Sequence, residues 1–221
     1  MKRLTLLPIL LFSFLYVNAQ DEVFGFMHKE LFIEGNIQYS SIDNQTTQNK
    51  ITTLGLNPKV GYFILDELAL GIQGSYQLET NTTTLPDPDP DTNTDVVRKV
   101  ETTYYSPGIF ARYYFLQLGK RFFTYGELGG NYGMKKRFVD VNGDIDNEVK
   151  TNVIDANLNL GLNYFVNDKI IISFSLADVV SYTSEKIDAD DAKPINTLNA
   201  NINVLNNFFQ TAQFGVMFIL N

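Results

Sequence analysis

Residues 151–165 read TNVIDANLNLGLNYF, and apolar and polar side chains alternate along the whole stretch. Isoleucine, alanine, leucine and tyrosine occupy the even positions from Ile154 to Tyr164, and aspartate, asparagine and glycine occupy the odd positions between them. Successive side chains of a β-strand point to opposite faces. This period of two therefore predicts a strand with one apolar and one polar face.

Other segments of the chain have the same period of two. One face of each is rich in Leu, Ile, Val, Tyr and Phe, and the other carries Asn, Gln, Ser, Gly and a few charges. The eight predicted strands span residues 31–41, 51–63, 68–78, 102–115, 121–133, 151–165, 170–177 and 208–220.

The connections alternate between short and long. The short ones are residues 64–67, 116–120 and 166–169, and the long ones are residues 42–50, 79–101, 134–150 and 178–206. An even number of strands with short turns at one end and long loops at the other is typical of an outer-membrane barrel. Lipid cannot satisfy a free sheet edge, so we expect the first strand to pair with the last. The predicted fold class is all-β: a closed antiparallel eight-stranded transmembrane β-barrel with short periplasmic turns and long extracellular loops.

A soluble all-β fold, such as a lipocalin-like barrel or a sandwich, is the alternative, because a sandwich could also bury the apolar face. The polar face favours the membrane barrel, since it carries many very small residues, which a narrow lumen tolerates. A solvent-exposed face would favour Thr, Lys and Glu instead. The small residues are Gly55, Gly61, Ala69, Gly71, Gly108, Gly129, Gly161 and Gly215.

The N-terminus has the build of a secretory signal peptide. Lys2 and Arg3 precede an apolar run that ends at Val17, and Val17 and Ala19 suit a signal-peptidase site. The run is shorter than the roughly 20 residues of a membrane-spanning helix, although an uncleaved anchor is the alternative. We predict that residues 1–19 are cleaved and that residues 20–221 form one barrel domain.

Composition excludes several functional classes. The 221 residues include 17 Lys+Arg and 25 Asp+Glu, and this net charge of −8 disfavours binding to nucleic acid. Cysteine is absent, which removes disulfides, thiol catalysis and thiolate metal sites. The single histidine, His28, lies just before the first strand, at the predicted periplasmic end. Enzymes on small barrels use a histidine with Ser or Asp near the outer leaflet, so we expect no enzymatic activity and no cofactor.

Three runs carry a family resemblance: NPKVGYFILDELALGIQGSY at 57–76, SPGIFARYYF at 106–115 and GELGGNYG at 126–133. They resemble the small outer-membrane β-barrel proteins grouped as OmpA/OmpX-like, in which a GYF–turn–LALG hairpin and an RYYF strand end recur. The resemblance covers essentially the whole mature chain. It implies a barrel in the outer membrane of a Gram-negative bacterium.

The C-terminal stretch resembles the signal that the barrel-assembly machinery reads. Gln213, Gly215, Phe218 and Leu220 fit its polar, glycine and hydrophobic positions, whereas Asn221 departs from the aromatic end of many members. The partners that the resemblance implies are this machinery, outer-membrane lipid and lipopolysaccharide. A closed barrel is sufficient as a monomer.

Five charged residues fall on the predicted inner face: Glu34, Lys59, Arg112, Glu127 and Asp155. Glu34 and Lys59 lie on adjacent strands, as do Arg112 and Glu127. An unpaired charge in a narrow lumen is unfavourable, so we expect these pairs to form a salt-bridged plug low in the barrel. Asp155 has no evident cation nearby and is expected to be hydrated.

Aromatic residues recur near the predicted strand ends and indicate two interfacial girdles. They are Tyr39, Tyr62, Phe63, Tyr76, Tyr104, Tyr105, Tyr113, Phe115, Phe122, Tyr132, Tyr164 and Phe165.

The long connections are polar and acidic. Asp87, Asp89 and Asp91 alternate with proline, which suggests a Ca²⁺ site. An EF-hand match fails at its sixth and twelfth positions, Thr92 and Arg98, so we predict a solvated loop without a metal. Asn142-Gly143 predicts a two-residue hairpin that extends the fifth and sixth strands.

Three functions are compatible with these patterns. The first is a structural or surface-interaction barrel that displays acidic loops over a plugged polar lumen. The second is a narrow channel for small solutes or ions, with a hydrated path past Arg112 and Glu127. The third is a soluble periplasmic lipid-binding barrel, which would have an apolar cavity.

Overall fold

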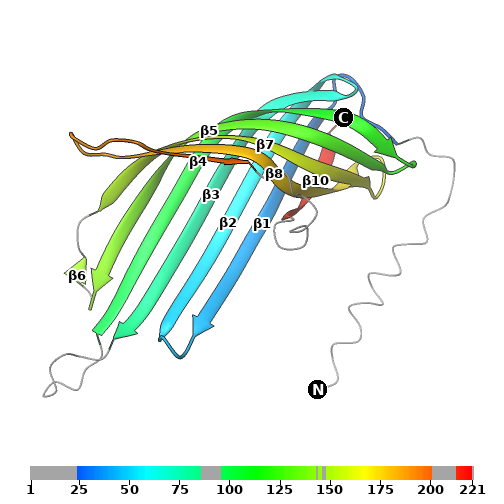
Figure 1. The fold of residues 1–221 in the computed structure, drawn as a ribbon. Helices are drawn as coiled ribbons and strands as arrows, with labels where there is room; N and C mark the ends of the chain where they lie inside the picture. The colour runs from blue at the N-terminus through cyan, green and yellow to red at the C-terminus, as the bar shows by residue number, and fades with distance from the viewer. Residues whose placement is uncertain (1–23, 86–95, 143, 146–147, 201–212, 221) are drawn as a thin grey trace, which may run out of the picture.

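The computed structural model describes residues 24–85, 96–142, 144–145, 148–200 and 213–220. These residues form one antiparallel sheet (Figure 1). No helix among them is long and apolar enough to cross a membrane. The strands are β1 (Leu31–Asn44), β2 (Asn49–Leu65), β3 (Leu68–Leu85), β4 (Val96–Leu118), β5 (Phe122–Val141), β6 (Asp144–Ile145), β7 (Val149–Phe165), β8 (Ile170–Ile187), β9 (Ile195–Ala200) and β10 (Gln213–Leu220).

Eight of these strands form a ring. The order is β1-β2-β3-β4-β5-β7-β8-β10, and β10 pairs with both β8 and β1. The pairing of the first and last predicted strands is therefore present, over residues 31–35 of β1. We call the space inside this ring the lumen. The two extra strands are short: β6 folds back on β5, and β9 pairs with the far half of β8.

The strands are longer than their apolar alternation predicts. Residues 79–85 and 96–101, expected in a long loop, continue the ladder between β3 and β4. The reason is that the alternation ends where the outer face becomes polar, whereas backbone pairing needs no apolar face. Threonines at 80 and 82–84 are β-branched and suit an extended backbone. The predicted long loops are thus largely paired strand.

Two turns follow from local side-chain chemistry. Asn142 has a φ of 53°, and its side-chain Oδ1 accepts a hydrogen bond from the Val97 backbone N–H at 2.8 Å. The chain then returns, because Asp144 pairs with Val141. The predicted hairpin is therefore confirmed, although Gly143 itself lies outside the described residues. At the opposite end, Asn167 Oδ1 accepts two backbone hydrogen bonds and closes the turn between β7 and β8.

The outer face of the ring carries the predicted apolar side chains. Ile37, Ile72, Ile109 and Leu128 are all largely exposed. Most of the aromatics assigned to girdles are exposed as well, including Tyr39, Tyr62, Tyr76, Tyr105, Tyr113, Phe115, Phe122 and Tyr132.

Three girdle assignments are wrong. Phe63 and Phe165 are fully buried inside the ring, and Tyr104 lines the lumen. Phe63 and Phe165 lie on the inner face where the strands approach the short turns, and there the interior is aromatic rather than polar.

Inward-facing glycines make room for these rings. Gly61 lies opposite Phe32 on the neighbouring strand, Gly71 opposite Phe110, and Gly161 opposite Tyr125. A Cβ at Gly161 would lie 2.1 Å from the Tyr125 ring, and one at Gly61 2.3 Å from the Phe32 ring. The small residues predicted for a narrow lumen therefore accommodate large neighbours.

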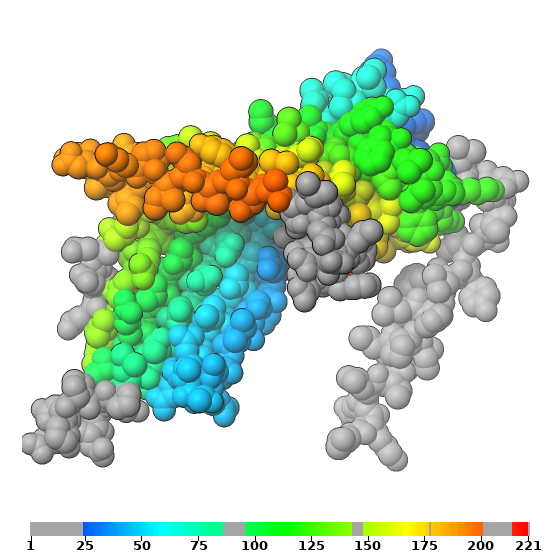
Figure 2. Space-filling model, viewed as in Figure 1, coloured from blue at the N-terminus to red at the C-terminus, as the bar shows by residue number. Residues whose placement is uncertain are grey.

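Beyond the ring, the strands continue as two diverging parts. The hairpin of β8 and β9 projects away from the edge formed by β1 and β2 (Figure 1). In the space-filling view the hairpin, in orange, is separated from β1 and β2, in blue and cyan (Figure 2). Within the described residues, β1 beyond Gly35 pairs with β2 alone.

Candidate functional site in the lumen

An aromatic cluster fills the lumen at the short-turn end. Phe26, from the segment before β1, lies 4.7 Å from Phe63, 4.2 Å from Tyr114 and 5.0 Å from Phe165 between ring centroids. Phe24 packs on Phe165 at 5.6 Å. We call Phe24, Phe26, Phe63, Tyr114 and Phe165 the aromatic plug. Its members are all buried.

Backbone hydrogen bonds hold the N-terminal part of this plug in place. Lys29 N–H donates to Phe63 O, and Phe63 N–H donates to Glu30 O, each at 2.9 Å. His28, predicted at this end, is exposed, and its backbone N–H donates to Asp66 Oδ1 at 2.7 Å. The sequence analysis did not identify this segment. Its only signal is the Phe24-Gly25-Phe26 alternation directly before the first strand.

Four charged side chains form a cluster next to the plug. Arg112 contacts Glu34 and Glu127, each through an N–O distance of 2.6 Å, and Lys59 pairs with Glu127. The Arg112 side chain is 0% exposed and that of Glu127 is 3% exposed. We call Glu34, Lys59, Arg112 and Glu127 the ion cluster. Its two positive and two negative charges balance, which a dry interior requires.

The expected pair of Arg112 and Glu127, which lie opposite each other on adjacent strands, is present, whereas the pairing of Glu34 and Lys59 differs from the expected one. Glu34 lies directly opposite Lys59 in the strand register, as predicted, yet its ion pair is with Arg112 on β4. Lys59 instead reaches Glu127 on β5. The prediction considered adjacent strands only, whereas in a narrow ring long side chains from opposite walls meet.

Aromatic rings and hydroxyls complete the surroundings of Arg112. Its guanidinium carbon lies 4.2 Å from the centroid of Tyr125 and 5.7 Å from those of Phe32 and Phe110. Such contacts stabilise a desolvated cation. Ser173 donates to Glu34 Oε1 at 3.2 Å. Packed rings and a hydrogen bond therefore hold Arg112 and Glu34 in place.

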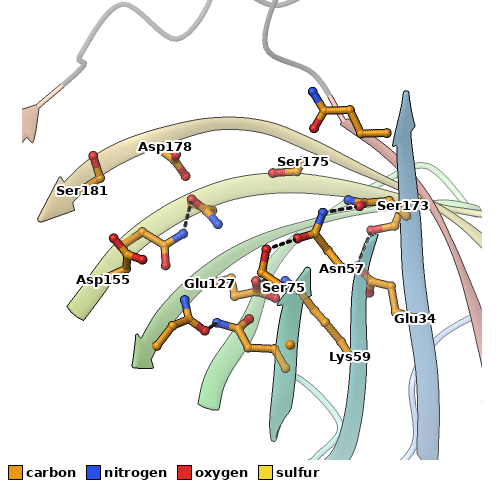
Figure 3. Close-up of a pocket in the computed structure, with 18 of the residues that line it drawn as sticks. Glu34, Asn57, Lys59, Ser75, Glu127, Asp155, Ser173, Ser175, Asp178 and Ser181 are labelled. Atoms are coloured by element: carbon orange, nitrogen blue, oxygen red, sulfur yellow. Dashed lines mark hydrogen bonds and ion pairs between the residues drawn. The ribbon is translucent and has the colours of Figure 1, made fainter. Parts of the chain in front are cut away.

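A polar cavity of about 1000 Å³ begins at the ion cluster and continues away from the plug. Amide and hydroxyl side chains form hydrogen bonds with one another along its wall. Asn57 donates to Asn36 at 2.7 Å, and Ser75 donates to Asn57 at 2.8 Å. Figure 3 shows side chains from both sides of the ring pointing into this space. The labelled ones are Glu34, Asn57, Lys59, Ser75, Glu127, Asp155, Ser173, Ser175, Asp178 and Ser181.

Asp155 is hydrogen-bonded within the protein. It accepts from the Tyr104 hydroxyl at 2.5 Å and from the Thr183 hydroxyl at 2.8 Å. The expectation of a merely hydrated carboxylate was wrong, because Tyr104 on β4 and Thr183 on β8 supply two hydroxyl donors. Asp155 also lines a second cavity of about 450 Å³, where Lys135 pairs with Glu185.

Asp178 also faces the cavity, and the sequence analysis did not identify it. Two register shifts between β7 and β8 flank it, because the Cα register passes over Leu176 on one side and Val179 on the other. Asp178 thereby lies opposite Asn159, an inward residue. The available signal was a loss of alternation after Ala177, which was interpreted as the end of the strand.

The predicted assembly-signal residues all lie in β10. Phe218 and Leu220 are exposed on the outer face, and Gly215 lines the cavity. Gln213 is the first residue of the strand. The candidate cation ligands Asp87, Asp89 and Asp91, the segment 1–19 and Asn221 lie outside the described residues.

An antiparallel ring with an apolar outer face and charged groups inside defines the class of outer-membrane β-barrel proteins. The chain belongs to the outer membrane protein beta-barrel domain family, whose model matches residues 5–208. This family places it in the outer membrane of a Gram-negative bacterium.

Solved structures of outer-membrane proteins are similar to this chain. OprG from Pseudomonas aeruginosa has 14% identity and a TM-score of 0.49, covering 90% of this chain and 100% of its own. Outer Membrane Protein W of E. coli has 14% identity and a TM-score of 0.41, covering 88% and 99%. Ail of Yersinia pestis has 17% identity and a TM-score of 0.40, covering 88% and 100%. No curated protein sequence matches the chain.

Proposed function

We propose that the protein is a closed, non-enzymatic outer-membrane barrel with a structural or surface-interaction role. The ring crosses the bilayer with its short turns in the periplasm. The strand extensions and acidic loops face the exterior, and the lumen is plugged. A single closed ring makes a monomer sufficient, with lipid, including lipopolysaccharide, around the apolar face. The segment Gln213–Leu220 serves as the signal for the barrel-assembly machinery.

The observation that carries this proposal is the double closure of the lumen. The aromatic plug and the ion cluster lie one behind the other, and both Arg112 and Phe26 are buried. An ion would have to displace packed rings and separate paired charges in turn. A lumen closed in this way favours a role for the outer and exterior surfaces.

Planar-bilayer recordings test the closure. We expect refolded wild type, Phe26→Ala and Arg112→Ala to be silent, because each single variant retains one of the two barriers. Phe26→Ala combined with Arg112→Ala should conduct. A double variant at exposed sites, Met27→Ala with Lys99→Ala, is the matched control and should stay silent.

Two results would contradict closure of the lumen by the aromatic plug and the ion cluster. A silent Phe26→Ala/Arg112→Ala barrel would show that neither group is the barrier, provided that heat-modified electrophoretic mobility proves it folded. Steady current through wild type would favour the narrow-channel function instead.

The channel remains the second candidate because of the cavity. The cavity extends down to the ion cluster, so the cluster and the plug are what separate it from the short-turn end. The soluble lipid carrier is supported less well, since the cavity wall is built from amides, hydroxyls and carboxylates. The acidic residues 86–95 are proposed to act as solvated surface rather than as a metal site.

A further inference from the structure

The cavity above the ion cluster carries more negative than positive charge. Glu34 and Glu127 are neutralised by Arg112 and Lys59. Asp155 and Asp178 line the same cavity, and neither forms an ion pair among the described residues. Two carboxylates are therefore left without a cation on the β7–β8 wall.

The backbone departs from a regular ladder around Asp178. On both sides of Asp178, the inward-facing residues of β8 have odd numbers. They are Ser173 and Ser175 before it, and Ser181 and Thr183 after it. An uninterrupted strand would place residue 178 on the outer face, next to lipid. The extra residue Leu176 shifts the alternation by one position, so that Asp178 points inward. The second extra residue, Val179, shifts the alternation back, so that odd-numbered residues face inward again. Bulges that redirect a side chain are frequent at functional sites, and an ionisable residue in a membrane segment marks a candidate site.

Two amide side chains lie between the two carboxylates along β7. Asn157 follows Asp155 on the inner face, and Asn159, which pairs with Asp178, comes next. The Asn157 amide donates to Asn159 Oδ1 at 3.1 Å, while Asn157 Oδ1 is buried and accepts no hydrogen bond. This part of the wall thus consists of polar side chains with a carboxylate on each side, Asp155 and Asp178.

The arrangement of the carboxylates along this wall determines which kind of cation can bind there. A metal ion needs several oxygen ligands gathered at one point. No group of three or more acidic or histidine side chains among the described residues is close enough to hold one. An extended molecule with several N–H donors can instead reach both carboxylates.

We propose that this cavity binds a small organic polyamine-like cation, with its ammonium groups at Asp155 and Asp178. The occupant enters from the side opposite the aromatic plug, where the cavity is not closed by the ion cluster. Binding leaves the ion cluster paired and needs no current through the barrel.

Calorimetric titration with spermidine tests this proposal. The protein is refolded in an uncharged detergent, and ionic strength is held constant because the acidic chain attracts cations non-specifically. We expect saturable one-to-one binding. Asp178→Asn should weaken it at least about tenfold, the loss of one hydrogen bond to a charged group. Asp155→Asn should also weaken the binding of spermidine.

Asp168→Asn is the matched control. It removes the same charge from the exposed turn between β7 and β8, at the other end of the ring, and should leave the affinity unchanged. In wild type, spermidine should shift the side-chain amide NMR signals of Asn157 and Asn159. This measurement does not depend on the folding of any variant.

Four outcomes would overturn the proposal. They are no saturable binding, an equal loss in Asp168→Asn, shifts confined to surface residues, and equally tight binding of Mg²⁺ or of sucrose. Each is distinct from failure of the closed-lumen function, which appears as wild-type current.

Discussion

At the scale of single residues, charge balance and space around side chains control the interior. Glu127 is the residue on which the ion cluster depends, because it pairs with both cations. Tyr125 covers the Arg112 guanidinium and occupies the space above Gly161. A change at either position therefore affects the same buried cation.

Replacement of Glu127 by glutamine should lower stability strongly. Arg112 and Lys59 would then face one carboxylate, and removal of one partner of a buried pair destabilises by roughly 3–5 kcal/mol. Denaturant unfolding in lipid vesicles measures the loss. Glu67→Gln, in an exposed turn, is the control and should change stability little. Equal stability of the two variants would contradict a desolvated cluster.

Gly161→Ala should destabilise by roughly 1–3 kcal/mol, as overpacking does. The new Cβ would lie 2.1 Å from Tyr125. Gly126→Ala is a matched control, because its Cβ would meet nothing within 4 Å. The same unfolding measurement applies, and a tolerated Gly161→Ala would show that Tyr125 moves freely away from Arg112.

At the scale of elements, the segment before β1 acts as part of the core although it has no regular secondary structure. Phe26 is 6% exposed and Met27, its neighbour, is 64% exposed. The segment stays in place through this ring and the backbone bonds to Phe63.

Phe26→Ala should release the N-terminal segment. Loss of a buried phenylalanine destabilises by roughly 3–5 kcal/mol, and trypsin should then cleave after Lys29 faster than in wild type. Met27→Ala should leave both stability and cleavage unchanged. Identical cleavage rates for all three proteins would mean that the segment is held by its backbone bonds alone.

At the scale of the whole molecule, the ring is apolar outside and polar or aromatic inside, the reverse of a water-soluble barrel. This arrangement is stable only if lipid covers the outer face. Two outward-facing residues of β4 lie in different surroundings. Ile109 lies within the apolar band, and Val97 lies in the extension beyond it.

Ile109→Arg should impair insertion by roughly 2–4 kcal/mol, the effect of a cation on the lipid face near the bilayer midplane. Val97→Arg, on the same strand and face, should insert like wild type. Folding yield into phosphatidylcholine vesicles, assayed by heat-modified mobility, compares them. Equal yields would contradict the assignment of Ile109 to the bilayer.

Much of the architecture could be predicted because alternation is a local property. Each inward or outward assignment in residues 151–165 needs only the neighbouring residues, and the register then follows from matching faces. The inward positions of Glu34, Lys59, Arg112, Glu127 and Asp155 were predicted in the same way. Of their partners, only the pair of Arg112 with Glu127 was predicted, because Arg112 also meets Glu34 across the ring and Asp155 meets hydroxyls on other strands.

The amino-acid order thus specifies the strands, their two faces and the membrane class, since all three depend on side chains close together in the chain. The aromatic plug, the crossed pairing of the ion cluster and the inward turn of Asp178 depend on contacts between distant residues. They arise when the ring brings Phe26 to Tyr114, Arg112 to Glu34 and β8 into a shifted register with β7. In such a narrow interior, a long side chain also reaches groups on the facing wall.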